Sequence, residues 1–284
     1  MDLNLPEELR LDPELSLSLL TRFIQDEVRG PGFERVVVGL SGGVDSALAA
    51  ALAVRALGRD RVTGLFMPHR VSSPQSRTDA ELVAEELGFK LEVIEITEAV
   101  DALARSVGID PEGGEEKERY GNIMARMRMI LLYDHSRKHR ELVLGTSNKS
   151  EALLGYTTHF GDNASAVNPI GDLYKTQVWQ MADFVGLPER IVKKPPSADL
   201  WVGQTDEGEL GFGYLVADRI LWRLVERRLP PEEVVREGFD PELVEEIRRR
   251  VRIYHYKRVP PVTPRINERA FGKDFLYLRD WAGW

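Results

Sequence analysis

The sequence of 284 residues contains no cysteine. A chain without thiols can form no disulfide, no thiolate nucleophile and no cysteine-based zinc site. This excludes a cysteine-type glutaminase built from these residues, and it excludes sulfur transfer through an enzyme persulfide. The lack of disulfides agrees with a cytoplasmic protein, which is the location we expect.

Long apolar segments are also missing. The best candidate, from Ala47 to Leu57, is shorter than the roughly 20 residues that span a membrane and is interrupted by Arg55. The first residues are acidic rather than basic, so we expect no signal peptide. Acidic residues outnumber basic ones by 46 to 38, and this net charge of −8 argues against a non-specific nucleic-acid binder. We therefore expect neither a membrane nor a nucleic acid as partner.

Short β-branched segments alternate with helical ones through the first two thirds of the chain. After a helical segment that ends near 30–32, the predicted strands and helices are 35–40, 45–57, 62–67, 78–87, 91–96, 120–138, 141–145 and 175–185. Such alternation indicates parallel strands that are joined by helices. We expect an α/β fold with a doubly wound parallel sheet.

The rest of the chain divides into a loop and a helical part. Residues 193–211 combine adjacent prolines with glycines and acids, and we expect a long loop that acts as a mobile lid. Residues 213–252 are mostly helical in pattern. We expect a single domain, 1–284, with a nucleotide-binding core at about 33–190, the lid at about 193–211 and added C-terminal helices at about 213–255.

The clearest local signal is the segment GLSGGVDS, which follows the first predicted strand and opens the next helix. Its residues are Gly39, Leu40, Ser41, Gly42, Gly43, Val44, Asp45 and Ser46. Glycines let the backbone approach a ligand closely, and hydroxyls and free N–H groups bind phosphate oxygens. The carboxylate of Asp45 would repel phosphate, so it indicates a bridging Mg²⁺. The segment lacks the lysine of a Walker A loop and the glycine spacing of a dinucleotide fingerprint.

This loop resembles that of the PP-loop ATP pyrophosphatases, which adenylate a substrate oxygen and release pyrophosphate. Further segments follow in an order that resembles the NAD synthetase family over about residues 23–261: 144–151, 155–162, 168–177 and 194–200. The resemblance implies an adenine nucleotide alpha hydrolase-like fold and a ligase that forms a C–N bond. It implies that ATP converts deamido-NAD (nicotinic acid adenine dinucleotide) to an acyl-adenylate, from which ammonia displaces AMP.

The resemblance also implies a role for individual residues. Asp45 and Lys175 are the catalytic candidates, and Asp45 and Glu151 are the candidate Mg²⁺ ligands. ATP is expected to bind the whole loop from Gly39 to Ser46 together with Thr146, Lys175 and Ser197. Deamido-NAD is expected to bind Asn122, Arg126, His159 and Lys257. The resemblance further implies a homodimer, and it allows for a separate glutaminase partner that supplies ammonia.

Four of these assignments have ordinary structural alternatives. Glu151 could complement the positive end of a helix, and Lys175 could be a solvated surface lysine. Arg126 could pair with a neighbouring carboxylate, and Thr146 could be a turn residue at the end of a strand. The sequence alone leaves these alternatives open.

Several positions depart from the family pattern. His159 stands where lysine is common, Ala166 stands where aspartate is common, and the usual His-Lys pair reads Tyr256-Lys257. A neutral histidine binds phosphate less well than lysine at neutral pH. An alternative substrate is therefore the shorter nicotinic acid mononucleotide.

Two other interpretations use basic residues. A PP-loop enzyme that modifies tRNA is an alternative function, but the missing cysteine argues against thiolation and the acidic balance argues against lysidine formation. The arginine run at 248–252 fits the charged end of a helix better than an RNA site. His135 and His139 are four residues apart, and we expect them on a solvated helix end rather than on a metal.

Overall fold

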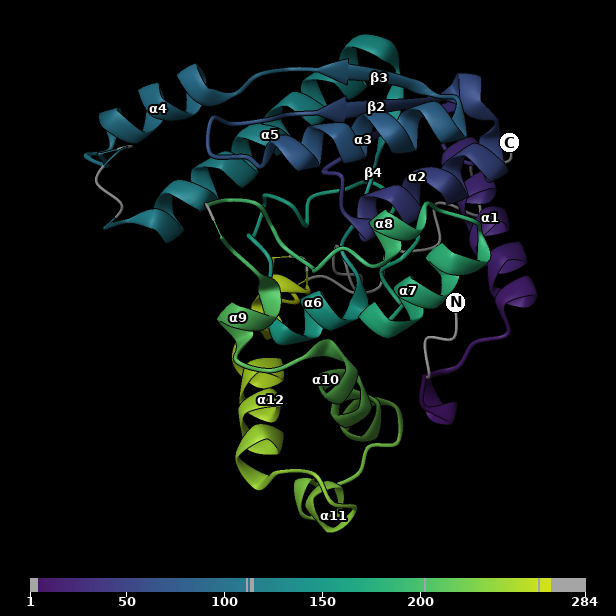
Figure 1. The fold of residues 1–284 in the computed structure, drawn as a ribbon, viewed down its shortest axis with the longest axis vertical. Helices are drawn as coiled ribbons and strands as arrows, with labels where there is room; N and C mark the ends of the chain where they lie inside the picture. The colour runs from purple at the N-terminus through teal and green to yellow at the C-terminus, as the bar shows by residue number, and fades with distance from the viewer. Residues whose placement is uncertain (1–4, 111, 113–114, 202, 260, 267–284) are drawn as a thin grey trace.

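A parallel sheet with the strand order β3-β2-β1-β4 forms the centre of the computed structural model, which describes residues 5–110, 112, 115–201, 203–259 and 261–266. The strands are β1 (Arg35–Gly39), β2 (Val62–Phe66), β3 (Lys90–Val93) and β4 (Glu141–Leu144). Each neighbouring pair is parallel, and Figure 1 shows β2 and β3 running in the same direction. Parallel strands need crossover connections, and helices provide them here.

Helices cover both faces of this sheet. One face is covered by α1 (Pro13–Arg29), α2 (Val44–Leu57), α3 (Pro74–Leu87) and α7 (Lys175–Phe184). The other face packs against α4 (Thr97–Ser106) and α5 (Lys117–His139). Alternate residues of β1 enter these two cores, with Val36 and Val38 on one side and Val37 on the other. The predicted doubly wound α/β sheet is confirmed.

Some predicted boundaries are wrong for identifiable reasons. The helix expected at 78–87 begins at Pro74, because the Ser73 side chain caps it and proline is favoured in the first turn. The strand expected at 91–96 ends at Val93, and the unpredicted α4 follows. Ile96, Val100 and Ala104 are buried at a spacing of four residues, which is the helical pattern that defines this short element.

The C-terminal helices form a second apolar core beside the sheet domain. Figure 1 shows α10 (Tyr214–Leu221), α11 (Pro231–Arg236) and α12 (Pro241–Ile253) together, on the far side of the molecule from β3. Their buried residues pack with Leu154 of α6 (Lys149–Leu154). The predicted helical C-terminal part is confirmed, and its membership of a single domain stays a prediction.

The expected lid at 193–211 is not structureless. It follows α8 (Glu189–Val192) and contains α9 (Asp206–Leu210), whose first turn is capped by the Thr205 side chain. The segment also bonds to itself, since Ser197 Oγ donates to the carbonyl of Gln204 at 2.7 Å. The prediction of a loop without secondary structure is therefore wrong for its last turn.

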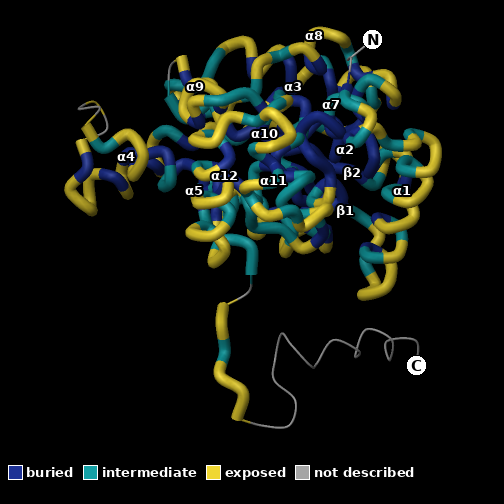
Figure 2. Tube along the Cα trace, turned by 90° about the horizontal axis from the view of Figure 1, so that it is seen from below, coloured by how far each residue is buried: buried dark blue, intermediate teal, exposed yellow. Residues whose placement is uncertain are grey.

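Burial follows the layers, with the sheet and α2 in the interior and the exposed residues on the outer helices (Figure 2).

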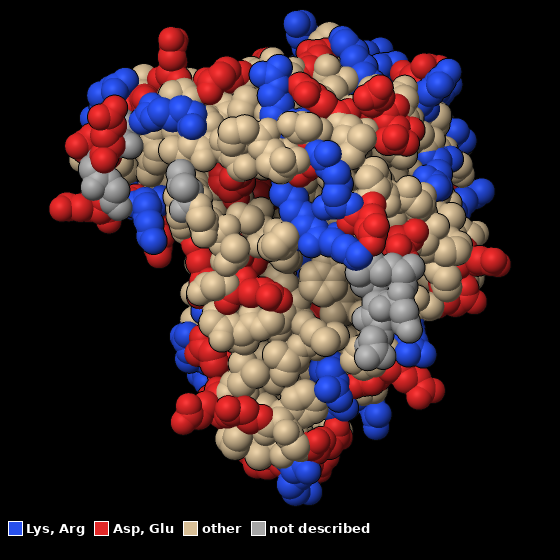
Figure 3. All heavy atoms as spheres, viewed as in Figure 1, with Lys and Arg blue, Asp and Glu red and all other residues tan. Residues whose placement is uncertain are grey.

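His135 is buried rather than solvated, and its Nδ1 lies 3.1 Å from Glu141 Oε2, so the expectation for this histidine is wrong. Three arginines of the run, Arg248, Arg249 and Arg250, pair with Glu245 and Glu246 of their own helix. Charges of both signs alternate over the face in Figure 3. Within the described ranges, no helix is long and apolar enough to cross a membrane.

Candidate active site

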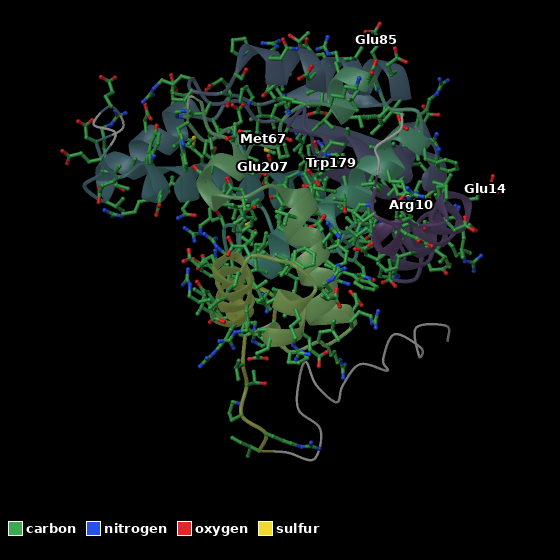
Figure 4. The ribbon with its side chains drawn as sticks, turned by 60° about the horizontal axis from the view of Figure 1, so that its bottom comes forward. Arg10, Glu14, Met67, Glu85, Trp179 and Glu207 are labelled. Carbon is green, nitrogen blue, oxygen red and sulfur yellow. The ribbon has the colours of Figure 1, made fainter. Side chains whose placement is uncertain are left out.

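A cavity of roughly 630 Å³ opens at the carboxyl ends of β1, β2 and β4, where ligands bind in open α/β sheets. The phosphate loop, residues 39–46, joins β1 to α2 and lies on its wall. Met67, just beyond β2, is another wall residue, and Figure 4 shows it in the interior while Glu14 and Glu85 lie at the periphery. Cavities of this size typically hold ligands such as nucleotides.

The phosphate loop is held by its own hydroxyls. Ser46 Oγ accepts the N–H of Ser41 at 3.2 Å and donates to the carbonyl of Gly43 at 3.1 Å. Gly42 has a φ of +76°, which favours glycine. A Cβ there would lie 2.4 Å from the carbonyl oxygen of Ser76 in α3, so this position also needs a residue without a side chain.

A buried lysine joins the two candidate metal ligands. Lys175 Nζ lies 2.5 Å from Asp45 Oδ2 and 3.2 Å from Glu151 Oε1. Asp45 comes from the start of α2, Glu151 from α6 and Lys175 from the start of α7. The lysine side chain is 2% exposed, so the alternative of a solvated surface lysine is wrong.

The charged side chains of Lys175, Asp45 and Glu151 influence one another's pKa values. Burial lowers the pKa of Lys175, but the carboxylates of Asp45 and Glu151 outweigh burial and raise the pKa above its usual value. Lys175 is therefore an ammonium at neutral pH. Burial raises the pKa of Glu151, and the charge of Lys175 opposes that rise.

Glu151 also has a local structural role. Asn148 caps α6 by accepting the N–H of Glu151 at 2.9 Å, and Glu151 Oε2 accepts the N–H of Asn148 at 3.2 Å. This reciprocal pair is a capping box. The Asn148 side chain donates to Asp45 Oδ1 at 2.8 Å as well. Glu151 therefore has both roles: it is an acid at the start of a helix, as in the structural alternative, and it contacts Lys175.

Asp218, on α10, ties together the starts of α6 and α7. It is fully buried and accepts three hydrogen bonds. The Ser150 hydroxyl donates at 2.5 Å, and the N–H and hydroxyl of Thr176 donate at 2.9 and 2.8 Å. Ser150 Oγ in turn accepts the N–H of Lys175 at 2.9 Å. Ser150 and Thr176 are the sequence neighbours of Glu151 and Lys175, so Asp218 fixes the two helices that carry the charged group.

The structure brings most, but not all, of the predicted site residues to one cavity. Thr146, Ser197, Asn122 and Lys257 line it together with the phosphate loop, Glu151 and Lys175. Gly42, Arg126 and His159, although all described, are not on its wall. Gly42 instead packs against Ser76 and Asp79 of α3.

Arg126 and His159 lie together outside the cavity. The Arg126 guanidinium donates to the carbonyl of His159 at 3.2 and 3.3 Å, so its partner is a carbonyl rather than the carboxylate of the alternative. Lys257 Nζ donates to the carbonyls of Gly155 and Thr157 at 2.8 and 2.7 Å. The assignment of these side chains to deamido-NAD stays a prediction.

Two carboxylates on the wall were not identified from the sequence. Asp162 is exposed, and its Oδ1 accepts the N–H of Thr158 at 2.6 Å. Asp206 is 3% exposed, burial raises its pKa, and its Oδ1 accepts no hydrogen bond from any residue that the structure describes. Asp162 ends a segment that had been singled out, whereas Asp206 stood in the expected lid without any local signal.

A parallel sheet with this loop, a lysine and two carboxylates at its carboxyl edge defines a nucleotide-binding α/β protein of the PP-loop class. The family model described as NAD synthase matches residues 16–261. The chain belongs to the NAD synthase family.

Relatives and solved structures agree with this assignment. The NH₃-dependent NAD⁺ synthetase of Trichlorobacter lovleyi is 48% identical over 96% of this chain and 98% of its own. That of Chlorobaculum tepidum is 47% identical over 97% of this chain and 98% of its own. Among solved structures, NMN synthetase from Francisella tularensis has a TM-score of 0.78 at 31% identity, and covers 90% of this chain and 99% of its own. NH₃-dependent NAD synthetase from Campylobacter jejuni has a TM-score of 0.75 at 34% identity, and the match covers 90% of this chain and 100% of that one.

Proposed function

We propose that this protein is an ammonia-dependent NAD synthetase, a ligase that amidates deamido-NAD with ATP and ammonia to give NAD, AMP and pyrophosphate. The observation that carries the proposal is the phosphate loop, whose Asp45 pairs with Lys175 beside Glu151 on the wall of one cavity. The family assignment and the curated relatives support it. The test is to incubate the protein with all substrates and Mg²⁺ and to follow NAD, AMP and pyrophosphate, which we expect in equal amounts.

The residues suggest how the first step proceeds. A carboxylate oxygen of deamido-NAD attacks the α-phosphorus of ATP, and the bond to the pyrophosphate oxygen breaks. The phosphate loop offers N–H groups to the phosphate chain, and the Lys175 ammonium stabilises the negative charge that develops. The resulting acyl-adenylate has AMP as a good leaving group. The nitrogen of ammonia then attacks the nicotinoyl carbon, the bond to AMP breaks, and the nitrogen loses a proton.

We propose that Asp45 and Glu151 hold Mg²⁺ when ATP is bound. Both carboxylates already share one cation, Lys175 Nζ, and hard oxygen ligands are those that Mg²⁺ prefers. Within the described part of the chain, no cluster of three or more His, Asp or Glu side chains could hold a metal. This fits Mg²⁺, which keeps water and substrate phosphates among its ligands. The ion would neutralise charge on the pyrophosphate as it departs.

We propose that Asp206 receives the nitrogen substrate. Ammonium is a cation and must lose a proton before it can attack, and a buried carboxylate without a partner for Oδ1 among the described residues suits both needs. Asp206→Asn should raise KM for ammonium about ten-fold or more while KM for ATP changes little. An unchanged KM for ammonium would rule out this role.

A second candidate substrate is nicotinic acid mononucleotide. The observation in its favour is the similarity to the Francisella tularensis structure described as NMN synthetase, together with Ala166 and the position of His159 outside the cavity. The curated relatives at 46–49% identity favour deamido-NAD, which we prefer. Measuring kcat/KM for both acids under the same ATP, Mg²⁺ and ammonia concentrations decides between them. A ratio in favour of the mononucleotide would change the substrate and leave the adenylation chemistry unchanged.

We propose that the nitrogen donor is free ammonia. Hydrolysis of glutamine by a thiolate needs a cysteine, and this chain has none. The purified chain should therefore work with ammonium salts and be at least about ten-fold slower with ammonia-free glutamine, unless a separate glutaminase is added. Equal rates with both donors would contradict this. A homodimer, a lid that orders over ATP and the dinucleotide, and a cytoplasmic location stay predictions.

A further inference from the structure

Lys194 reaches from the segment after α8 to the back of the phosphate loop. Its Nζ donates to the carbonyl of Gly42 at 3.1 Å and to Asp79 Oδ2 at 2.8 Å. Its distance to Ser76 Oγ is 3.5 Å, the outer limit for a hydrogen bond. Because an ammonium has three N–H donors, one of them is left with only this weak contact. The side chain lines the cavity and is 24% exposed.

The charges around Lys194 leave one positive charge in excess. Asp79 is 2% exposed, and its Oδ1 already accepts hydrogen bonds from the Arg190 guanidinium and from Gln75 Nε2. Burial raises the pKa of Asp79, but its bonds to Lys194, Gln75 and Arg190 outweigh burial and lower the pKa, so the group is a carboxylate. Arg190 balances this single negative charge, and the charge of Lys194 remains. At Lys175 the ratio is reversed, since two carboxylates face one cation.

The position of Lys194 is fixed relative to the phosphate loop. Gly42 packs so closely on α3 that an added Cβ would lie 2.4 Å from the Ser76 carbonyl and 3.0 Å from Asp79 Cβ. The loop and α3 are therefore in tight contact, and the Lys194 ammonium bonds to both of them. Lys194 lines the same cavity as the phosphate loop, so its ammonium is available to a phosphate chain that binds to the N–H groups of the loop.

We infer that Lys194 is a further ATP-binding residue, which contacts the β- and γ-phosphates and so stabilises the pyrophosphate that leaves. This inference rests on the proposed function, because it assumes that ATP occupies the phosphate loop. It predicts that the loss of the Lys194 charge weakens binding of ligands that carry the pyrophosphate group and does not weaken binding of AMP.

The neighbouring residue offers a matched control. Lys193 carries the same charge, but it pairs with Glu189 at the surface and does not line the cavity. Lys193→Met should therefore leave the binding of all three ligands unchanged. Lys194→Met removes the charge and the hydrogen bonds together, whereas Lys194→Gln removes the charge and keeps an N–H donor on a side chain that is one atom shorter.

The experiment is calorimetric titration of the wild type and the three variants with magnesium pyrophosphate, magnesium ATP and AMP. We expect both Lys194 variants to bind pyrophosphate and ATP about ten-fold more weakly or worse and AMP with unchanged affinity, since a charge-assisted hydrogen bond is lost. Wild-type affinity for pyrophosphate in Lys194→Gln would overturn the inference, also if Lys194→Met fails to fold. Failure of the proposed function would appear separately, as a wild type that binds ATP but forms no NAD.

Discussion

At the scale of single residues, the site depends on a lysine that is buried between two carboxylates. Burying charges is costly unless they are paired, so Lys175, Asp45 and Glu151 hold one another in place. Removing either carboxylate changes the charge next to the phosphate loop without emptying the core, since both carboxylates are partly exposed to the cavity. Effects on turnover should therefore exceed effects on folding.

Asp45→Asn and Glu151→Gln each remove a hard anionic ligand and keep the shape of the side chain. We expect each variant to lose about 10²-fold or more in kcat, comparable to the loss of one preorganised electrostatic group. Circular dichroism should show an unchanged fold. Steady-state rates at saturating ATP and Mg²⁺ make the check, and near-native turnover in either variant would remove that residue from the proposed Mg²⁺ site.

Gly42 and Gly43 provide a matched pair for the phosphate loop. Gly42→Ala places a methyl group at positive φ and 2.4 Å from the Ser76 carbonyl oxygen, whereas Gly43 has a φ of −96° and the nearest atom to an added Cβ is the Ser41 hydroxyl at 3.3 Å. We expect Gly42→Ala to cost about 2–4 kcal/mol and to lower Tm by roughly 4–10 °C, and Gly43→Ala to cost less than about 1 kcal/mol. Thermal unfolding measures both, and equal shifts would show that the contact with α3 is not tight.

At the scale of helices and strands, Asp218 is the link between the C-terminal helices and the site. It sits on α10, yet its hydrogen bonds hold the first turns of α6 and α7. Burial raises the pKa of Asp218 to about 6, although its bonds to Ser150 and Thr176 oppose the rise. The ionised form is thus less favourable in the folded protein than in the unfolded chain.

This raised pKa predicts a pH dependence of stability. The contribution of Asp218 is fully present below the pKa of an unfolded aspartate, near 4, and is lost as pH rises through about 6. Asp218→Asn cannot titrate, so the unfolding free energy of the wild type minus that of the variant should fall between about pH 4 and 6 and be constant above about pH 7. Urea unfolding across this range makes the measurement, with Asp134→Asn on an exposed part of α5 as control. A difference that is flat or rises with pH would contradict the burial argument.

The elements that were predicted from the sequence are those with strong local signals. The β-branched residues of β1 and the Ala- and Leu-rich α2, ended by Gly58, left little choice of structure. The short helices α4 and α9 were missed, since few residues carry their pattern. Their identity depends on which side chains the rest of the fold buries, and a local window does not contain that information.

At the scale of the whole molecule, the site unites residues that are far apart in the chain. The resemblance to a family supplied Asp45, Glu151 and Lys175, and the structure brings them together. Lys194 opens the segment 194–200 that carried part of the resemblance but was given no role, and Asp206 carried no local signal. Their contacts follow from how the segment after α8 returns to the phosphate loop and to the cavity. That return path is a tertiary property and is not encoded in a local motif.

The central claim is that the chain adenylates the carboxylate of its acid substrate before nitrogen attacks. The most direct test uses deamido-NAD labelled with ¹⁸O in both carboxylate oxygens, together with ATP, Mg²⁺ and ammonium, followed by mass spectrometry of the products. The account predicts one labelled oxygen in the phosphate of each AMP, the other in the amide of NAD, and none in pyrophosphate. Unlabelled AMP, or label in pyrophosphate or inorganic phosphate, would contradict it.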